Sequence, residues 1–521
     1  MKATSRVPAA WPLAAARGWL APAGHAPFLR ARAFALSPGQ LATLLLLVYG
    51  VVWLGACALT ALSPPVDNLE QLTWQHQLAW GYYKHPPLPT ALAWLAVKAL
   101  GPGAWTTYLL GASLTLASLA LFWRLLRTLR GPHYATIALL AALCITFYNG
   151  RLDYYNHNVV LMVAVAAAAV ACWQAHERRT WGAWALVGVV FGLGMLAKYQ
   201  MVVTALSAAV FWATQRGWRD PVQRRGALLA VLIALAICVP HVLWLREHGF
   251  PPVDYAIESS LGARQSLAES VHGSILWLVD ALLNRALPAL LLLGVVGMLG
   301  TRAAKAQPGA AGQRAGAVPE RSARALLLSW GLVPLLFMPA MGVAFGSELQ
   351  LQWGTPFLLF VVPCAMEMLP ARTWQHARLD AALKAFLVLQ VLLLVIDLVT
   401  SPYGPPALRS RRHWRNVSGS ELAARIVEPA RLRLGAPVHI IIGPQGEGGT
   451  LALQLPGDPL LLIDGRFDRS PWLTPAMVQA CGALELAHWK VPPAGWSAVG
   501  EPFHALYWRT LAPDRSMPCR T

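Results

Sequence analysis

The sequence predicts a mainly α-helical, polytopic membrane protein with about 11 (11–13) transmembrane helices, interfacial helices and a small C-terminal α/β domain. Of its 521 residues, 56% are hydrophobic and 13% are charged, whereas soluble domains are about 25% charged. Apolar runs of about 18 or more residues recur along the chain, and each is long enough to cross a bilayer. These observations exclude an ordinary cytosolic enzyme and a disordered chain.

The first 39 residues form a basic segment that contains no acid. No cleavage site follows the apolar run 41–62, so we expect that run to remain as the first span, with residues 1–39 in the cytosol. The next apolar run, 88–100, is too short to span and follows Pro86-Pro87. We predict an interfacial helix there, because a full span would put Arg124 to Arg130 on the wrong side.

Ten further spans complete a membrane domain over residues 40–400, and they are predicted at 105–126, 134–149, 157–174, 182–197, 200–214, 226–244, 275–299, 326–342, 354–370 and 383–400. With this assignment nearly every short arginine cluster falls on the cytosolic side. The net charge of +18 is therefore a topology signal, and we expect no nucleic-acid partner.

Residues 401–521 have a different composition, with 13 Lys/Arg and 9 Asp/Glu and no spanning run. Residues 438–442, a glycine-rich turn at 443–449 and residues 460–463 predict strand, loop, helix and strand. The turn lacks the G-x-G-x-x-G spacing, so a plain strand-to-helix connection is favoured over a nucleotide site. Cys481 and Cys519 could pair if this domain lies outside the cytosol.

The predicted outer loop between the first two spans is unusually rich in polar and aromatic side chains. Pro86-Pro87 fixes the backbone there and can begin the next helix. A solvated connector with interfacial aromatics is the alternative interpretation. The candidate functional residues of this loop are Asp67, Glu70, Tyr82, Tyr83, Lys84 and His85.

Two further polar stretches lie at the same predicted surface. One covers residues 149–158 and contains Arg151 and Asp153; an ordinary turn with Asn156 or Asn158 as a helix N-cap is its alternative. The other is the turn at Lys198, which interrupts an apolar hairpin, and ionisable groups at membrane depth are functional candidates. Together these carboxylates and cations suit a hydroxyl acceptor deprotonated by a carboxylate, with a phosphate leaving group held by Lys and Arg.

The remaining titratable groups near the ends of spans are interpreted as structural residues. Asp280, Arg285, Glu367 and Asp397 are expected to pair or to reach polar surroundings near the ends of spans. No metal site is assigned. His157 and His241 are candidate ligands of a divalent metal, but the sequence places no convincing second ligand one helical turn away.

The motifs resemble those of the integral-membrane GT-C glycosyltransferases, in the family 39-like branch near the protein O-mannosyltransferases and the lipid A aminoarabinose transferase. The resemblance covers roughly residues 40–465. Three positions depart from the family pattern: Asn68 stands where many relatives have a second adjacent acid, His85 separates Lys84 from the prolines, and 347–353 replaces a Lys or His ahead of Tyr-Leu-Pro. The matching segments are the acidic motif at Asp67, Lys84-His85-Pro86-Pro87-Leu88, Leu152-Asp153, Gly194 to Lys198, Pro240 to Trp244 with His248 to Phe250, and Leu451 to Gly457.

The resemblance implies a GT-C-type bundle in the bacterial inner membrane, with the N-terminus cytosolic and the active site and C-terminal domain periplasmic. It implies inverting transfer of one hexosyl or pentosyl unit from a polyprenyl-phosphate donor, such as undecaprenyl phosphate, at the outer face. The acceptor would be lipid A or lipopolysaccharide, another glycolipid, a glycan or a protein.

The resemblance also implies a role for each candidate residue. Asp67 would be the general base, and Asp153 would orient the acceptor or its loop. The remaining candidates would contact substrates: Lys84, Lys198 and Arg151 the lipid phosphate, and Glu70, Tyr82, Tyr83 and His85 other substrate groups.

Two other classes of function compete with transfer. A transporter or flippase of lipid-linked sugars would show inverted repeats and polar residues near the bilayer midplane, whereas this sequence has no internal repeat and its polar clusters lie at one predicted surface. A non-catalytic envelope scaffold would tolerate the joint loss of Asp67 and Lys84.

Overall fold

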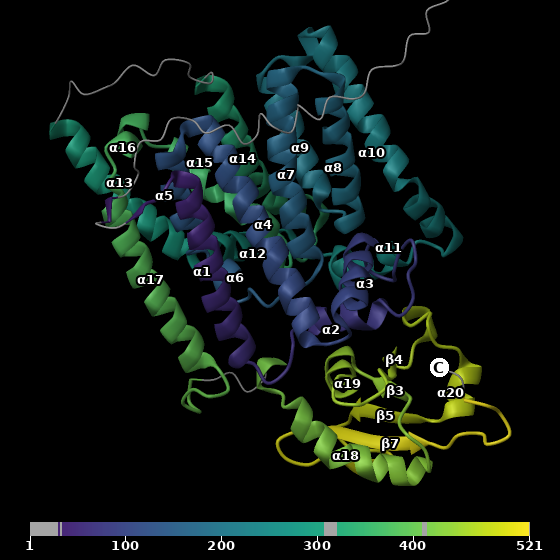
Figure 1. Ribbon diagram of the computed structural model, residues 1–521. Coiled ribbons are helices and arrows are strands. Elements are labelled where there is room, and N and C mark those ends of the chain that lie inside the picture. Colours follow the sequence, from purple (N-terminus) through teal and green to yellow (C-terminus); the bar gives the residue numbers. More distant parts are fainter. Residues whose placement is uncertain (1–29, 32–33, 307–319, 409–413, 520–521) are drawn as a thin grey trace, which may run out of the picture.

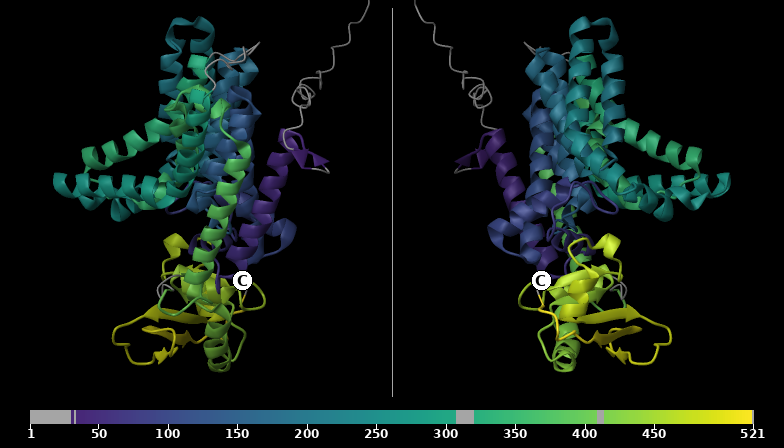
Figure 2. Two further views of the ribbon diagram at one scale, coloured as in Figure 1. Left: turned by 90° about the vertical axis from the view of Figure 1, so that its left-hand side faces the viewer. Right: turned by 90° about the vertical axis from the view of Figure 1, so that its right-hand side faces the viewer.

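The computed structural model describes residues 30–31, 34–306, 320–408 and 414–519. Most of the predicted cytosolic segment 1–39 lies outside the described residues. The helices form a bundle, and a small sheet with its own helices lies at one end of it (Figures 1 and 2). A two-residue strand pair, β1 (Arg30–Ala31) and β2 (Phe34–Ala35), precedes the first helix.

Seven of the described helices are long and apolar enough to cross a membrane. Three shorter apolar helices accompany them: α3 (Leu88–Leu100), α8 (Trp181–Ala197) and α9 (Met201–Thr214). The protein is therefore a multi-pass membrane protein, while the count of about 11 spans stays a prediction. The seven are α1 (Pro38–Leu59), α4 (Ala104–Arg130), α7 (His157–Arg178), α10 (Pro221–Glu247), α13 (Leu287–Ala306), α14 (Glu320–Phe345) and α17 (Leu379–Thr400).

Two predicted spans are broken in the structure. The run 134–149 folds as α5 (Pro132–Ala142) and the short α6 (Thr146–Asn149), and 354–370 folds as the 3₁₀ segment η5 (Leu351–Phe360) followed by α15 (Val361–Glu367). α5 lies at the centre of the bundle, since every residue from Tyr134 to Ala142 is buried. Shorter elements complete this part: α11 (Pro251–Ser259), α16 (Ala371–Gln375), η2 (Gly217–Arg219) and η3 (Leu261–Ala263).

The predicted single span 275–299 is wrong in its boundaries. Its first residues belong to α12 (Leu267–Val279), a π-helical segment η4 (Asp280–Arg285) follows, and α13 begins only at Leu287. Arg285 pairs with Asp280 and also donates to the Thr355 hydroxyl at 3.0 Å. The ion pair joins residues five apart, at the two ends of the π-helical segment, and Arg285 also connects that segment to η5.

The other pairings expected of isolated charges are present. Arg130, the last residue of α4, forms two 2.8 Å hydrogen bonds with the Glu367 carboxylate. Asp397 of α17 pairs with Arg415 at 2.9 Å. The Arg130–Glu367 pair joins α4 to α15, which are distant in the chain, and the Asp397–Arg415 pair joins α17 to the segment that follows it. Each carboxylate therefore has a counter-charge.

The C-terminal part contains a five-stranded sheet of order β4-β3-β5-β7-β6. β3 pairs in parallel with β4 and β5, while β7 pairs antiparallel with β5 and β6. The apolar run of β3 is buried throughout, as expected for an interior parallel strand. Its elements are η6 (Trp414–Asn416), α18 (Gly419–Leu434), β3 (Ile440–Gly443), α19 (Gln445–Ala452), β4 (Leu460–Ile463), η7 (Phe467–Arg469), α20 (Pro475–Cys481), β5 (Ala483–His488), β6 (Ser497–Ala498) and β7 (Leu506–Leu511).

The structure confirms the predicted order of elements in this part of the chain, with β3, α19 and β4 following one another. Cys481 forms a disulfide with Cys519, a pairing that the sequence left open. The core of the sheet also includes Trp74 and Tyr82 from the loop after the first span. The sheet and the helical bundle therefore share one packed junction.

Candidate active site

Four segments bring most of the predicted site residues to the end of the bundle that faces the C-terminal sheet. α2 (Val66–Trp74) carries Asp67 and Glu70, and the connection from α2 to α3 carries Lys84. The N-terminus of α7 and the turn between α8 and α9, which holds Lys198, complete the group. Figure 1 shows α2 and α3 between the bundle and α19.

Asp67 lies in the first turn of α2 and is partly exposed. Its Oδ2 accepts a 2.8 Å hydrogen bond from the Asn156 side-chain amide. The carbonyl oxygen of the same Asn156 side chain caps α7 by accepting from the Val159 N–H at 3.1 Å. Asn156, one of the two N-caps that the sequence left open, thus caps α7 and also orients the Asp67 carboxylate.

Asn68 explains one departure from the family motif. Its side chain is fully buried and donates to the Asp153 backbone carbonyl at 2.8 Å and to the Thr107 hydroxyl at 2.9 Å. Its Oδ1 accepts from the Tyr155 N–H at 2.9 Å. Only an amide can donate and accept in this way, so Asn68 ties α2 to the loop 150–156.

Glu70 and Lys84 form a buried ion pair. Burial raises the pKa of Glu70 to about 7 despite the neighbouring ammonium. Burial alone would lower the pKa of Lys84, but the Glu70 carboxylate outweighs it and the Lys84 pKa is raised. The ammonium also lies 5.9, 5.7 and 5.6 Å from the ring centroids of Trp74, Tyr83 and Tyr255, so Lys84 is held as a cation.

Lys198 is 9% exposed and donates to the Asn158 side-chain oxygen at 2.7 Å. Within the described parts of the chain, no carboxylate lies within ion-pair distance of it. An ammonium has three donors, and a single neutral acceptor leaves most of its charge unbalanced. Lys198 is therefore prepared to bind an anion.

The aromatic candidates differ in their surroundings. Tyr82 is buried, stacks on Trp74 at 4.7 Å and donates its hydroxyl to the Gln77 carbonyl at 2.9 Å, which favours a packing role. Tyr83 is half-buried, and Arg469 of η7 lies 5.1 Å from its ring centroid. The His85 ring lies 3.8 Å from that of His157.

Arg151 and Asp153 line a separate small polar cavity of about 110 Å³, together with Cys57, Trp414 and Arg415. Burial raises the pKa of Asp153 to about 7, and the Arg151 guanidinium lies 5.1 Å from the Tyr154 ring centroid. This placement suits the predicted orienting role of Asp153 better than it suits the predicted phosphate contact of Arg151.

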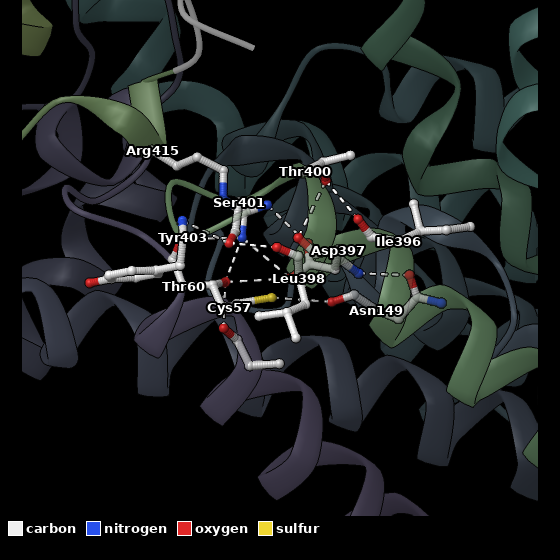
Figure 3. A network of polar contacts seen from close by, with 12 residues as sticks. Cys57, Thr60, Asn149, Ile396, Asp397, Leu398, Thr400, Ser401, Tyr403 and Arg415 are labelled. Atoms are coloured by element: carbon white, nitrogen blue, oxygen red, sulfur yellow. Dashed lines mark hydrogen bonds and ion pairs between the residues drawn. The ribbon is translucent and has the colours of Figure 1, made fainter. Parts of the chain in front are cut away.

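A polar network surrounds this cavity and connects the two parts of the chain (Figure 3). Arg415 pairs with Asp397 and bonds the Thr60 hydroxyl at the end of α1. The Cys57 thiol donates to the Asn149 carbonyl at 3.4 Å. The network holds the ends of α1, α6 and α17 against the segment that leads to the C-terminal sheet.

The predicted glycine-rich turn 443–449 is largely helical in the structure: it joins the end of β3 to the first residues of α19, which pack against α2. A Cβ on Gly449 would lie 3.0 Å from the Leu69 Cβ, so a side chain there would push α2 away. The Gln445 amide donates to the Thr73 hydroxyl at 3.1 Å. The plain strand-to-helix interpretation thus fits the structure, because α19 supports the helix that carries Asp67 and Glu70.

The sequence interpretation did not single out Tyr255 or Arg469 as site residues. Tyr255 lies on α11, and its ring centroid is 5.8 Å from that of Tyr83. No sequence motif marks either residue, because only the tertiary fold brings them to Lys84 and Tyr83. Of the two candidate metal ligands, His241 has both ring nitrogens in hydrogen bonds, with Tyr199 and the Trp80 carbonyl.

Comparisons with known proteins agree with this architecture. The family model of dolichyl-phosphate-mannose-protein mannosyltransferases matches residues 84–244. The chain is 23% identical over 420 residues to the lipopolysaccharide core galacturonosyltransferase RgtA of Rhizobium johnstonii, covering 77% of this chain and 78% of that protein. It is 25% identical over 190 residues to the lipid A galacturonosyltransferase RgtD of the same organism, covering 35% and 38%.

The fold is also that of a solved membrane protein. The crystal structure of ArnT from Cupriavidus metallidurans bound to undecaprenyl phosphate superposes with a TM-score of 0.51 at 16% identity, covering 91% of this chain and 99% of that chain. The fold and the sequence matches define a membrane glycosyltransferase. Together these matches indicate a glycosyltransferase similar to those of the GT-C superfamily, in agreement with the resemblance of its motifs.

Proposed function

We propose that the protein transfers a single sugar from a polyprenyl-phosphate donor to an envelope acceptor, with inversion at the anomeric carbon. The observation that carries the proposal is the grouping of the partly exposed Asp67 carboxylate with the buried cations Lys84 and Lys198 at one end of an apolar bundle. A carboxylate base and a cationic phosphate site are the two components that such a displacement requires.

In this reaction the acceptor hydroxyl oxygen attacks the anomeric carbon, and the bond from that carbon to the phosphate oxygen breaks. The hydroxyl proton passes to Asp67, and the bonding electrons leave with the polyprenyl phosphate. Lys198 and Lys84 stabilise the negative charge that develops on the leaving phosphate. Asn156 keeps the Asp67 carboxylate oriented through its 2.8 Å hydrogen bond.

An apolar cavity supports a lipid-linked donor. Its volume is about 530 Å³, and it lies among α7, α8, α9 and α10. Its lining follows α9 from Val202, near the Lys198 turn, to Gln215, which is roughly 20 Å of helix at 1.5 Å per residue. A hydrocarbon chain in this cavity would have its phosphate end near Lys198.

The acceptor class is proposed from the relatives. RgtA is described as a lipopolysaccharide core transferase and RgtD as a lipid A transferase, so we favour lipid A or the lipopolysaccharide core over a glycan or protein acceptor. ArnT was solved with undecaprenyl phosphate, which favours the same carrier here. The sugar belongs to the hexosyl or pentosyl class.

We further propose that the site and the C-terminal sheet are periplasmic, at the outer face of the bacterial inner membrane. The Cys481–Cys519 disulfide supports this orientation, because such bonds persist in oxidising compartments. The proposed functional units keep the predicted ranges: the membrane domain 40–400 and the periplasmic domain 401–521. A flippase of lipid-linked sugars is the alternative, but the large cavity is lined mainly by apolar side chains.

The proposal is tested by complementing a deletion strain and measuring its envelope glycolipids by mass spectrometry. Asp67→Asn should be expressed and inserted at wild-type levels but fail to restore the missing sugar, since only the base is lost. Asp380→Asn is the matched control, because Asp380 forms an exposed ion pair with Arg378 away from the site. Restoration by Asp67→Asn at the level of the control would contradict the assignment of the base.

A further inference from the structure

α10 has few buried residues, and one of them is a histidine. The helix runs along the outer side of the bundle (Figure 1), and its buried residues are Gln223, Gly226, Ala230 and His241. The first three lie in the first half of α10, so His241 is the buried residue of the second half. A polar ring that is buried in an otherwise outward-facing helix needs hydrogen-bond partners from other segments.

Both ring nitrogens of His241 have such partners. Nδ1 lies 2.5 Å from the Trp80 carbonyl oxygen, and Nε2 lies 2.8 Å from the Tyr199 hydroxyl oxygen. A carbonyl can only accept, so Nδ1 carries the proton, and in the neutral imidazole Nε2 accepts from Tyr199. One ring therefore joins the connection 75–87 to the turn between α8 and α9. We call Trp80, Tyr199 and His241 the His241 bridge.

The two segments that the His241 bridge joins are those that carry the buried cations. Tyr199 directly follows Lys198, and Trp80 precedes Lys84 in the same connection. The ammonium groups of Lys84 and Lys198 are close enough to repel each other. Contacts between the two segments must oppose this repulsion, and the His241 bridge supplies two hydrogen bonds that do so.

Trp244, about one helical turn after His241, supports the same connection. A Cβ on Gly81 would lie 2.3 Å from the Trp244 ring, so the backbone at Gly81 lies directly against the indole. The rings of His241 and Trp244 are nearly parallel, at an interplanar angle of 11°. Val202 and Val242, which neighbour the His241 bridge, line the apolar cavity. The bridge therefore lies where the proposed lipid cavity meets the buried cations.

We propose that His241 is a positioning residue of the phosphate site, and that its two hydrogen bonds set the separation of Lys84 and Lys198. The phosphate contact itself rests on the proposed function. A phosphate between two ammonium groups needs hydrogen bonds of about 2.7–2.9 Å to both, and a misplacement of about 1 Å can cost on the order of a hundredfold in catalysis. His241 acts through the two segments and contacts neither the phosphate nor the sugar.

The experiment compares the binding of undecaprenyl phosphate and undecaprenol to full-length protein in nanodiscs. The two lipids share one hydrocarbon chain, so the ratio of their dissociation constants measures recognition of the phosphate. We expect the wild type to prefer undecaprenyl phosphate, and His241→Phe to lose at least tenfold of this preference, because phenylalanine keeps a planar ring without a donor or acceptor. Tyr199→Phe removes one of the two hydrogen bonds and should lose less.

The double variant tests whether both side chains act through the same contact. His241→Phe combined with Tyr199→Phe should be no worse than His241→Phe alone, because the second change removes a hydrogen bond that is already lost. The matched controls are His272→Phe, at an exposed histidine of α12, and Tyr403→Phe, at an exposed tyrosine. Both controls should keep the wild-type preference.

A general structural role for His241 predicts a different result, since damage to the cavity would weaken the binding of both lipids and leave the ratio unchanged. A wild-type ratio in both His241→Phe and Tyr199→Phe would overturn the positioning role alone. Equal binding of the two lipids by the wild type would overturn the phosphate site of the proposed function as well, so the two failures are distinguishable. Unfolding temperatures check the fold, and Tyr199→Phe, which leaves the Trp80 contact intact, decides the test if His241→Phe does not fold.

Discussion

The substitution Asn68→Asp tests how the site is positioned. It is isosteric and restores the acidic pair that many relatives carry, so the motif alone would predict a neutral or favourable effect. The structure predicts damage. Asn68 is fully buried and donates to the Asp153 carbonyl and the Thr107 hydroxyl, and an ionised carboxylate can donate to neither.

The expected cost is large for an isosteric change. Two lost hydrogen bonds contribute about 1 kcal/mol each, and the carbonyl left without a donor adds roughly 1–3 kcal/mol, which gives about 3–5 kcal/mol. The loop 150–156 would separate from α2, so the orientation of Asp67 by Asn156 would also suffer. We expect a clearly lower unfolding temperature and at least tenfold less sugar transfer.

The assay is thermal unfolding of purified protein at pH 5 and pH 8, beside glycolipid analysis of complemented cells. The deficit should shrink at pH 5, because a protonated carboxyl regains one donor. Gln77→Glu is the control, since Gln77 is exposed in the same outer connection. Wild-type stability and transfer by Asn68→Asp at pH 8 would refute the positioning role of Asn68.

Three further predictions follow from other contacts. Gly449→Ala should lower sugar transfer several-fold, because the added Cβ would lie 3.0 Å from the Leu69 Cβ on α2. Gly446→Ala is the control, since its nearest neighbour lies at 3.5 Å, and it should leave transfer unchanged. Equal activities of the two variants would contradict the support of α2 by α19. Ala234→Trp fills the apolar cavity and should weaken use of the lipid-linked donor. Its control is Ala236→Trp, at an exposed position on the same helix outside the cavity lining. The same dependence of transfer on donor concentration in both variants would refute the lipid site. Burial raises the pKa of Asp153 from 3.8 to about 7, so the folded state binds more protons than the unfolded state between these values, and stability should fall as pH rises through this window. This loss of stability between pH 4 and pH 8 should be smaller in Asp153→Asn than in the wild type, by up to about 4 kcal/mol. Unfolding temperatures measured from pH 4 to 8 test this, and identical pH slopes for the two proteins would contradict the burial of the Asp153 carboxyl.

Much of the fold could be predicted because its causes are local. Apolar runs and arginine clusters act residue by residue, so α1, α4, α7 and α10 lie close to their predicted ranges. The boundary error at 275–299 accompanies a tertiary contact, since Arg285 of the Asp280–Arg285 pair also donates to Thr355 of η5. No local pattern encodes a partner that lies 70 residues away in the chain.

In the candidate site, too, features with local causes could be predicted from the sequence and features with tertiary causes could not. Asp67, Glu70, Lys84 and Lys198 are charged residues in apolar or aromatic surroundings, and that contrast is visible in the sequence. The role of Asn68 is not visible there, because it depends on which segments meet. The Asn68 side chain positions α2 through its contacts with the Asp153 carbonyl and the Tyr155 N–H.

The central claim is that the protein joins a sugar covalently to an envelope acceptor. The most direct measurement compares envelope glycolipids and polyprenyl-linked precursors of a deletion strain and its parent by mass spectrometry. We expect one envelope glycolipid to lose the mass of one monosaccharide while the matching polyprenyl-phosphate sugar accumulates at the outer face. Unchanged glycoconjugates, or a precursor trapped at the cytosolic face, would contradict a transferase and favour the scaffold or the flippase.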